Sequence, residues 1–385
     1  MRLGDCCKTN LHTYSDKEKW SLIRYLDTGS ITEGRIDEIQ TLYPGVDKIP
    51  SRARRKASVG DILFSTVRPN QKHYGIIEAG TENLLVSTGF TVVTVDTTIA
   101  DPYFIYYYLT QSSVIESLQA IAEQSTSTYP SIKPSDIEDI ELDLPELETQ
   151  KKIGSTLRML DRKIALNEEI NDNLQHQAFS VFDNLIANAE NNDYTVSDYA
   201  FLNPKRTLAK NQVARSIDMS QLSTSGAFPS GWEMKPFNGG MRFTNGDTLL
   251  ARITPCLENG KTAFIDFLDD GETAFGSTEY IVLAPKNDTP PEMLYCLARY
   301  PAFVDYAVKN MNGSSGRQRV SAETVGQYRL PLFDKHSLVL FKEVVSPMFL
   351  RMRYNSLENM RLAELRDALL PKLMSGEIDV SAVQP

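Results

Sequence analysis

Two long stretches of the chain repeat apolar residues at alternating spacings of four and three positions. The first stretch follows Pro145 and contains no further proline before residue 186. This spacing is typical of a helix in a coiled coil, and about 40 residues at 1.5 Å each predict a rod of about 60 Å. The predicted seam comprises Ile153, Leu157, Leu160, Ile164, Asn167, Asn171, Leu174, Ala178, Val181 and Leu185.

The second stretch repeats this seam at an offset of 188 residues, including its interruption by two asparagines. The seam asparagines are Asn167 and Asn171 in the first stretch, and Asn355 and Asn359 in the second. A buried polar residue in a seam costs stability and sets helix register. If the two helices pack together, we expect these asparagines to hydrogen-bond to one another; at a solvated edge they would have no such role. Pro371 should kink or end the second helix.

The same offset relates the segments upstream of the helices. The string DPYFIYYYLTQSSVI from Asp101 aligns without gaps on TPPEMLYCLARYPAF from Thr289, and GDIL at residue 60 resembles GDTL at residue 246. Two diverged copies of a whole domain produce such a pattern. We therefore expect an α+β protein with two globular units of mixed α and β structure, separated by two long helices. Packed as an antiparallel coiled coil, the helices would relate the units by a pseudo-two-fold axis.

Within the globular units, short runs rich in β-branched residues predict strands, and longer apolar-periodic runs predict helices. The predicted strands cover 61–67, 90–95 and 280–283, and the predicted helical stretches lie near 103–122 and 291–309. Loops rich in Gly, Ser and Thr follow at 124–129 and 312–319. Such loops suit contacts with backbone phosphates, but they are equally typical of plain surface connections.

The composition is that of an ordinary globular protein of roughly two or three domains, with 41% apolar and 23% charged residues. We find no apolar run near the roughly 20 residues that would span a bilayer, so we expect a cytoplasmic protein. The four cysteines have no metal-ligand spacing, and for adjacent Cys6 and Cys7 we favour two small buried residues over a metal or redox site.

The formal net charge of −10 argues against a nucleic-acid-binding protein unless charge is segregated along the chain. Residues 48–74 hold seven basic residues and one acidic residue, and residues 205–261 hold eight basic and four acidic. Each stretch alone is explained by a solvated face. Two of them at matching places in a repeat favour phosphate contact.

Arginine is suited to bidentate recognition of guanine, and Asn or Gln to recognition of adenine. The candidate DNA-binding residues are Arg52, Arg54, Arg55, Arg68, Gln71, Lys72, Arg242, Arg252, Lys261, Arg317 and Arg319. We identify no catalytic or metal-binding constellation, because the four histidines are scattered and no nucleotide-binding or hydrolase motif is present.

Two strings resemble motifs of the specificity subunits of type I restriction-modification systems. LPELETQKKI from Leu144, followed by LDRKI from Leu160, is similar to that family's junction between a target recognition domain and a conserved helix. LRDALLPKLMSGEI from Leu365 is similar to its C-terminal signature, and GDIL at residue 60 to its recognition-domain core. At the second junction, LFDKH from Leu332 departs from the pattern, which leaves the boundary near 333 open.

The resemblance implies target recognition domains over 1–145 and 191–332, a helical spacer over 146–190, and a second spacer with the C-terminal tail over 333–385. It implies a non-catalytic subunit whose two domains each read one half of a bipartite DNA site. Two modification subunits would bind the helices and methylate adenine, and two restriction subunits could join them. The chain itself would carry no cofactor; S-adenosylmethionine would bind to the modification subunits.

Two other functions remain open from the residues alone. A coiled-coil adaptor would join proteins without contacting DNA, and the basic stretches argue against it. A DNA-modifying enzyme with an unrecognised site would act as the purified chain alone. A gel shift with and without a methyltransferase partner separates the first alternative from a specificity subunit.

Overall fold

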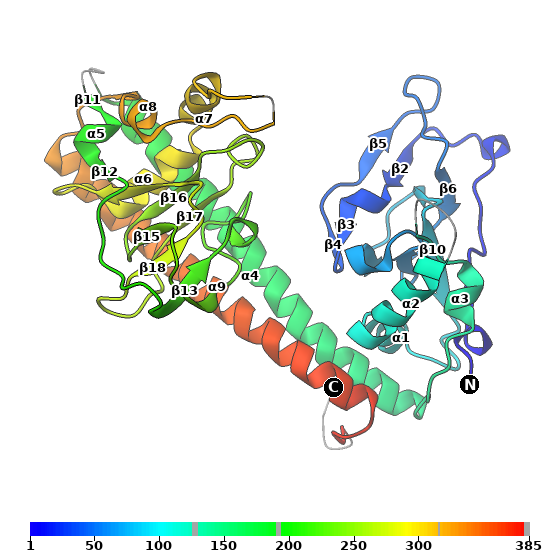
Figure 1. The fold of residues 1–385 in the computed structure, drawn as a ribbon. Helices are drawn as coiled ribbons and strands as arrows, with labels where there is room; N and C mark the ends of the chain where they lie inside the picture. Colours follow the sequence, from blue (N-terminus) through cyan, green and yellow to red (C-terminus); the bar gives the residue numbers. More distant parts are fainter. Residues whose placement is uncertain (125–129, 190–193, 315, 381–385) are drawn as a thin grey trace. The chain divides into compact units, whose positions relative to one another are not determined.

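The computed structural model of the chain describes residues 1–124, 130–189, 194–314 and 316–380. It divides into two compact units: unit 1 comprises Met1–Asp161 and Glu364–Pro385, and unit 2 comprises Arg162–Ala363. Two long helices, α4 (Leu147–Ala187) and α9 (Lys335–Met374), each contribute to both units. The expected α+β class with two long helices is confirmed, and Figure 1 shows the path of the chain by colour.

Unit 1 contains two four-stranded sheets. The first has the order β1-β10-β7-β8, with β1 (Cys7–Thr9), β7 (Ile62–Ser65), β8 (Tyr74–Ile76) and β10 (Phe90–Val95), and all its pairs are antiparallel. The second has the order β5-β2-β9-β6, with β2 (Ile23–Leu26), β5 (Gln40–Leu42), β6 (Ala53–Lys56) and β9 (Leu84–Ser87). Its one parallel pair joins β2 and β9. The short strands β3 (Ile31–Thr32) and β4 (Arg35–Ile36) pair separately.

The helices of unit 1 are α1 (Pro102–Leu109), α2 (Ser112–Gln124), α3 (Pro134–Glu138) and the first part of α4. Among the described residues of unit 1, the 3-10 turn η1 (Leu3–Asp5) precedes β1, and three more lie between strands: η2 (Asp16–Glu18), η3 (Thr28–Ser30) and η4 (Pro69–Gln71). The end of α9 and the tail after it complete the core of this unit, where Leu373 and Val380 are buried with side chains of α1 and α2.

Unit 2 contains two sheets with the corresponding strand orders. The first is β12-β19-β16-β17, with β12 (Ala200–Leu202), β16 (Thr248–Ala251), β17 (Thr262–Phe264) and β19 (Tyr280–Pro285). The second is β14-β13-β18-β15, with β13 (Val213–Ile217), β14 (Glu233–Pro236), β15 (Met241–Phe243) and β18 (Ala274–Gly276). Its one parallel pair joins β13 and β18.

The remaining helices of unit 2 contribute side chains to the core on one face of the first sheet. The helices are α5 (Val196–Tyr199), α6 (Pro291–Arg299), α7 (Pro301–Lys309) and α8 (Ala322–Gly326). The 3-10 turn η5 (Met219–Gln221) follows β13, and the short strands β11 (Tyr194–Thr195) and β20 (Arg329–Leu330) pair with each other.

Alternation along the strands explains the layers. Successive side chains of a strand point to opposite faces of its sheet. In unit 1, Ile62 and Phe64 of β7 join the core beneath the helices, while Leu63 joins the core between the two sheets. In unit 2, Leu250 and Leu249 of β16 separate in the same way. Each unit is therefore a helix layer, a first sheet and a second sheet, and burying each of these side chains contributes about 1.5–3 kcal/mol.

The predicted helical stretches are confirmed, and the structure shows where they divide and where the last helix ends. The stretches predicted near 103–122 and 291–309 are each two helices, α1 and α2, and α6 and α7. The second break occurs because Pro301 occupies the first turn of α7 and restricts Tyr300 to an extended backbone. The helix α9 also continues past Pro371 to Met374, with the backbone N–H of Ser375 bonded to the Pro371 carbonyl at 3.0 Å.

Candidate nucleic-acid interface

In unit 1, three segments meet at the end of β7. The backbone N–H of Thr66 donates to the Gly89 carbonyl at 2.8 Å, and that of Ile132 donates to the Thr66 carbonyl at 2.9 Å. The N–H of Arg68 donates to the Pro130 carbonyl at 3.0 Å. These bonds join the loop after β7, the turn between β9 and β10 and the segment before α3. We call this place the three-loop cluster of unit 1.

Four of the predicted DNA-binding residues lie at this cluster. Arg52 belongs to it because its carbonyl accepts a bond from the Thr88 N–H at 2.9 Å. Arg68 and Lys72 flank η4 in left-handed conformations, at φ 48° and 57°. The side chains of all four are exposed, and Lys72 forms an ion pair with Glu33. The four residues are Arg52, Arg68, Gln71 and Lys72.

The other two predicted residues of unit 1 lie on β6. The Arg55 guanidinium donates to the Asn10 side-chain oxygen and to the Phe90 carbonyl, and burial lowers its pKa. Arg55 therefore holds β1 and β10 to the second sheet. Arg54 is half-buried at the irregularity in β6, beside a cavity of about 440 Å³ that Tyr14 and Trp20 also line.

In unit 2 the corresponding bonds recur at the end of β16. The N–H of Arg252 donates to the Glu279 carbonyl at 3.0 Å, and that of Val320 donates to the Arg252 carbonyl at 3.0 Å. The N–H of Thr254 donates to the Gln318 carbonyl at 3.1 Å. This is the three-loop cluster of unit 2.

Among the predicted residues of unit 2, Arg252, Arg317 and Arg319 lie at the cluster, and Arg317 is the most exposed of them. The Arg319 guanidinium grips both carboxylate oxygens of Glu279 at 2.7–3.0 Å. These hydrogen bonds lower the pKa of Glu279, so its carboxylate is ionised near neutral pH. Glu279 was not among the residues predicted from the sequence, because a lone acidic residue carries no signal for a site built from distant loops.

Arg242 and Lys261 have other surroundings. Arg242 lies on β15 in the second sheet, with its guanidinium 5.6 Å from the centre of the Phe237 ring. The Lys261 ammonium donates to the carbonyl of Met219 in η5 at 2.8 Å. Of the loops predicted to contact phosphates, residues 125–129 and 315 lie outside the described residues.

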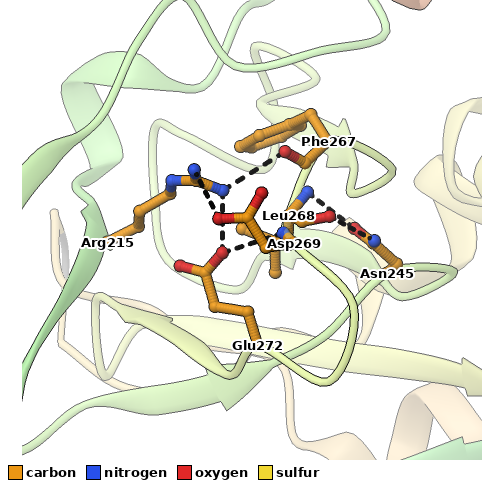
Figure 2. A network of polar contacts seen from close by, with 6 residues as sticks. All are labelled: Arg215, Asn245, Phe267, Leu268, Asp269 and Glu272. Carbon is orange, nitrogen blue, oxygen red and sulfur yellow. Dashed lines mark hydrogen bonds and ion pairs between the residues drawn. The ribbon is translucent and has the colours of Figure 1, made fainter.

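In the second basic stretch, 205–261, fewer side chains are available to contact DNA than the number of basic residues indicates. Figure 2 shows Arg215 of β13 bonded to the Phe267 carbonyl and to the carboxylates of Asp269 and Glu272, at 2.8–3.3 Å. Beside it, the Asn245 side chain brackets the backbone of Leu268 with two bonds of 2.8 and 2.9 Å. This network holds the loop between β17 and β18, so Arg215 has a structural role.

The repeated Gly-Asp pairs lie at the opposite end of β7 and β16 from the three-loop clusters. Asp61 accepts from the Ser58 N–H at 2.7 Å, and Asp247 accepts from the Thr244 N–H at 2.8 Å. Asp247 is buried beside Arg206, and burial raises its pKa to about 6 despite that ion pair and the bond from Thr244. These carboxylates order the turns that begin the strands.

The four seam asparagines lie between α4 and α9 in unit 2. Asn167 donates to the Asn359 side-chain oxygen at 2.8 Å, and Asn355 donates to that of Asn171 at 2.8 Å. Asn167 and Asn355 are fully buried. Since the bonded positions rise along α4 as they fall along α9, the helices run antiparallel here.

Within the described part of the chain, no group of three or more His, Cys, Asp or Glu side chains is arranged to hold a metal ion. No helix in that part is long and apolar enough to cross a membrane. All four cysteines are free thiols, and Cys6 and Cys7 are buried.

Comparison with known proteins gives consistent matches. Residues 48–176 match the model of the family described as "Type I restriction modification DNA specificity domain". The chain is 24% identical to the HindI specificity subunit of Haemophilus influenzae over 98% of both chains. It is 21% identical to the MjaIX specificity subunit of Methanocaldococcus jannaschii over 83% of this chain and 78% of that one.

Among solved structures, the chain is similar to the S subunit of a type I restriction-modification system from M. genitalium. The TM-score is 0.56 at 16% sequence identity, over 99% of this chain and 96% of that chain. At this identity the likeness is one of fold.

Proposed function

The chain belongs to the family of type I restriction-modification specificity subunits, and from this premise we propose that each of its units reads one half of a bipartite DNA site. The protein determines DNA sequence specificity and is not itself the enzyme of the complex. The observation that carries the proposal is the recurrence of the three-loop cluster, with the same three backbone bonds, in both units. The cluster of unit 1 presents several exposed cationic side chains. That of unit 2 presents the exposed Arg317 beside the half-buried Arg252 and Arg319. Cationic side chains suit contacts to phosphates and to base edges.

We assign the target recognition domains to residues 1–145 and 191–332, and the helical spacers to 146–190 and 333–385. The matching strand orders of the two units support an internal repeat. The asparagine bonds support an antiparallel coiled coil with a pseudo-two-fold axis, because the repeat offset of 188 exchanges one bonded pair for the other. In this arrangement the asparagines set the helix register, and the helices set the unread spacer.

The residues proposed to contact DNA divide by their surroundings. Arg52, Arg68, Gln71 and Lys72 in unit 1, and Arg252, Arg317 and Arg319 in unit 2, lie at the three-loop clusters. Arg54, Arg242 and Lys261 lie outside the clusters. For these three residues the proposed role is contact with phosphates. Of the residues predicted from the sequence to bind DNA, Arg55 is the least suited to contact it, because its guanidinium already donates hydrogen bonds within unit 1.

The partners are DNA and a modification subunit, and we propose two modification subunits for each chain, with two restriction subunits able to join. S-adenosylmethionine would bind to the modification subunits. An exposed apolar stripe on α9 in unit 2 supports docking on the helices, because large apolar side chains gathered on one face are typical of a protein interface. The stripe comprises Val339, Leu340, Val344, Leu350 and Tyr354.

The test is co-expression with the cognate modification subunit, followed by mapping of the methylated adenines. We expect one motif in two parts with a fixed gap, and a gel shift that is stronger for the complex than for the isolated chain. A continuous motif would contradict two separate readers. Either of two results would support the coiled-coil adaptor. In the first, the modification subunit methylates a standard substrate only when this chain is absent. In the second, the complex assembles with this chain but does not bind DNA.

A further inference from the structure

The two three-loop clusters keep their backbone bonds but differ in their side chains. In unit 1 the bonds join Thr66 to Gly89 and to the segment before α3. In unit 2 they pair Arg252, Glu279 and the segment before α8. The turn is also closed alike, since a serine Oγ accepts the N–H of Gly89 at 3.3 Å and that of Glu279 at 3.1 Å. The fold therefore needs the backbone at this position and not the Glu279 carboxylate.

The neighbouring position shows the same exchange. Ser131 bridges Val67 in unit 1, where Arg319 bridges Ile253 in unit 2. The Arg319–Glu279 pair thus occupies two positions at which unit 1 has Ser131 and Gly89. The pair is partly exposed, at 37% for the Arg319 side chain and 26% for that of Glu279. Both charged groups are therefore accessible from solvent.

A carboxylate on a DNA-binding face is unfavourable near phosphates, because the two negative charges repel each other. It is useful in the major groove, where Glu and Asp accept a hydrogen bond from the amino group of cytosine. The bidentate bonds from Arg319 hold the Glu279 carboxylate in one orientation. Oε1 of Glu279 accepts bonds from both Nε and Nη2 of Arg319, whereas Oε2 accepts only from Nε. Oε2 can therefore accept one further hydrogen bond.

We propose that Glu279, oriented by Arg319, determines specificity at one base pair of the half-site read by unit 2, by accepting a hydrogen bond from the amino group of cytosine. The inference rests on the proposed function and identifies one residue that recognises a base within it. Glu279 is the contact to the base, and Arg319 is the residue that positions it.

The test compares methylation maps of the co-expressed complex containing the wild-type chain, E279Q or R68A. Gln keeps the size of Glu and can still accept from Arg319, so the variant is expected to fold. We expect E279Q to lose about tenfold to a hundredfold of its preference for cytosine at one position, and to change no position in the other half of the motif. R68A should weaken preference in that other half, because Arg68 belongs to unit 1.

The matched control is E272Q, which removes the charge from another partly buried Arg–Glu pair of unit 2, Arg215–Glu272. Its map should equal that of the wild type. An E279Q map identical to the wild-type map would overturn the inference, as would changes by E279Q and R68A in the same half. Should the E279Q complex fail to assemble, E279D replaces it: it keeps the charge but shortens the reach, and an unchanged motif would again overturn the inference.

The wild-type map by itself distinguishes a failure of the proposed function from a failure of the role proposed for Glu279. A wild-type complex with no two-part motif overturns the proposed function, and the reading by Glu279 with it. A two-part wild-type motif that E279Q leaves unaltered overturns only the role of Glu279.

Discussion

At the scale of single residues, the same type of side chain has different roles that depend on its neighbours. Arg55 bonds within unit 1, Arg215 braces a loop of unit 2, and Arg68 lies exposed at a three-loop cluster. Carboxylates divide likewise: Glu279 is ionised and partly exposed, whereas Asp247 is buried. The residue type predicts what a side chain can do, and its surroundings decide what it does.

Asp247 makes stability depend on pH in an unusual direction. Burial raises its pKa to about 6, so the folded chain binds a proton between pH 4 and 6 that the unfolded chain releases. The contribution of this group is present below pH 4 and is lost as the pH rises through 6, by roughly 3 kcal/mol. D247N should remove this loss. The measurement is the difference in free energy of unfolding between wild type and D247N at pH 4, 5, 6 and 7.

D61N serves as the comparison for that measurement, because Asp61 holds the corresponding turn of unit 1. A difference between wild type and D247N that stays constant from pH 4 to 7 would mean that Asp247 titrates in the folded chain as it does in the unfolded chain.

At the scale of elements, the long helices combine an apolar seam with a polar interruption. Asn355 donates to Asn171, and Asn167 donates to Asn359 and to Glu358. A buried amide left without its partner loses its hydrogen bonds and keeps its desolvation cost. Removing both members of a bonded pair avoids that cost.

Single and double substitutions of one asparagine pair should therefore differ in their effect. We expect N355L to lower the free energy of unfolding by about 1–3 kcal/mol, because the side-chain oxygen of the half-buried Asn171 loses the hydrogen bond from Asn355. N171L/N355L should recover most of that loss. Urea denaturation of the four members of the double-mutant cycle measures the coupling.

N173L is the control for the cycle, since Asn173 is an exposed asparagine of the same helix and should change stability by less than about 0.5 kcal/mol. If N355L costs no more than N173L, the asparagine pair does not stabilise the helix contact.

At the scale of the whole molecule, a chain of net charge −10 is expected to bind a polyanion through locally gathered cations. Each phosphate contact releases counterions, so affinity for DNA falls as salt rises. A lysine that contacts a phosphate acts as a point charge, and its loss weakens binding equally for all sequences. Lys72 at the cluster of unit 1 is such a lysine in the proposed function.

We expect K72Q to reduce the slope of log affinity against log salt by about 0.9, with the same loss on cognate and non-cognate DNA. Gel shifts of the assembled complex over a series of salt concentrations measure both quantities. K151Q is the matched control, because Lys151 forms a similarly exposed ion pair, with Glu148 on α4. Equal slopes for K72Q and the wild type would exclude a phosphate contact by Lys72.

The sequence by itself determined the features that depend on local periodicity. The alternating four-three spacing predicted two long helices, and α4 and α9 are present. Short runs rich in β-branched residues predicted the strands at 90–95 and 280–283, which are β10 and β19. Within helical stretches the breaks were missed, since Pro301 acts on the backbone of Tyr300 and leaves the apolar period unchanged.

Only the tertiary structure decided which residues share a site. The bonds that join Thr66, Gly89 and Ile132 connect positions far apart in the chain, and no local pattern records such pairing. For the same reason the sequence ranked Arg55 beside Arg68, although only Arg55 is bonded to β10, and it passed over Glu279. Periodicity is written in neighbouring residues, whereas a binding surface exists only once distant loops have met.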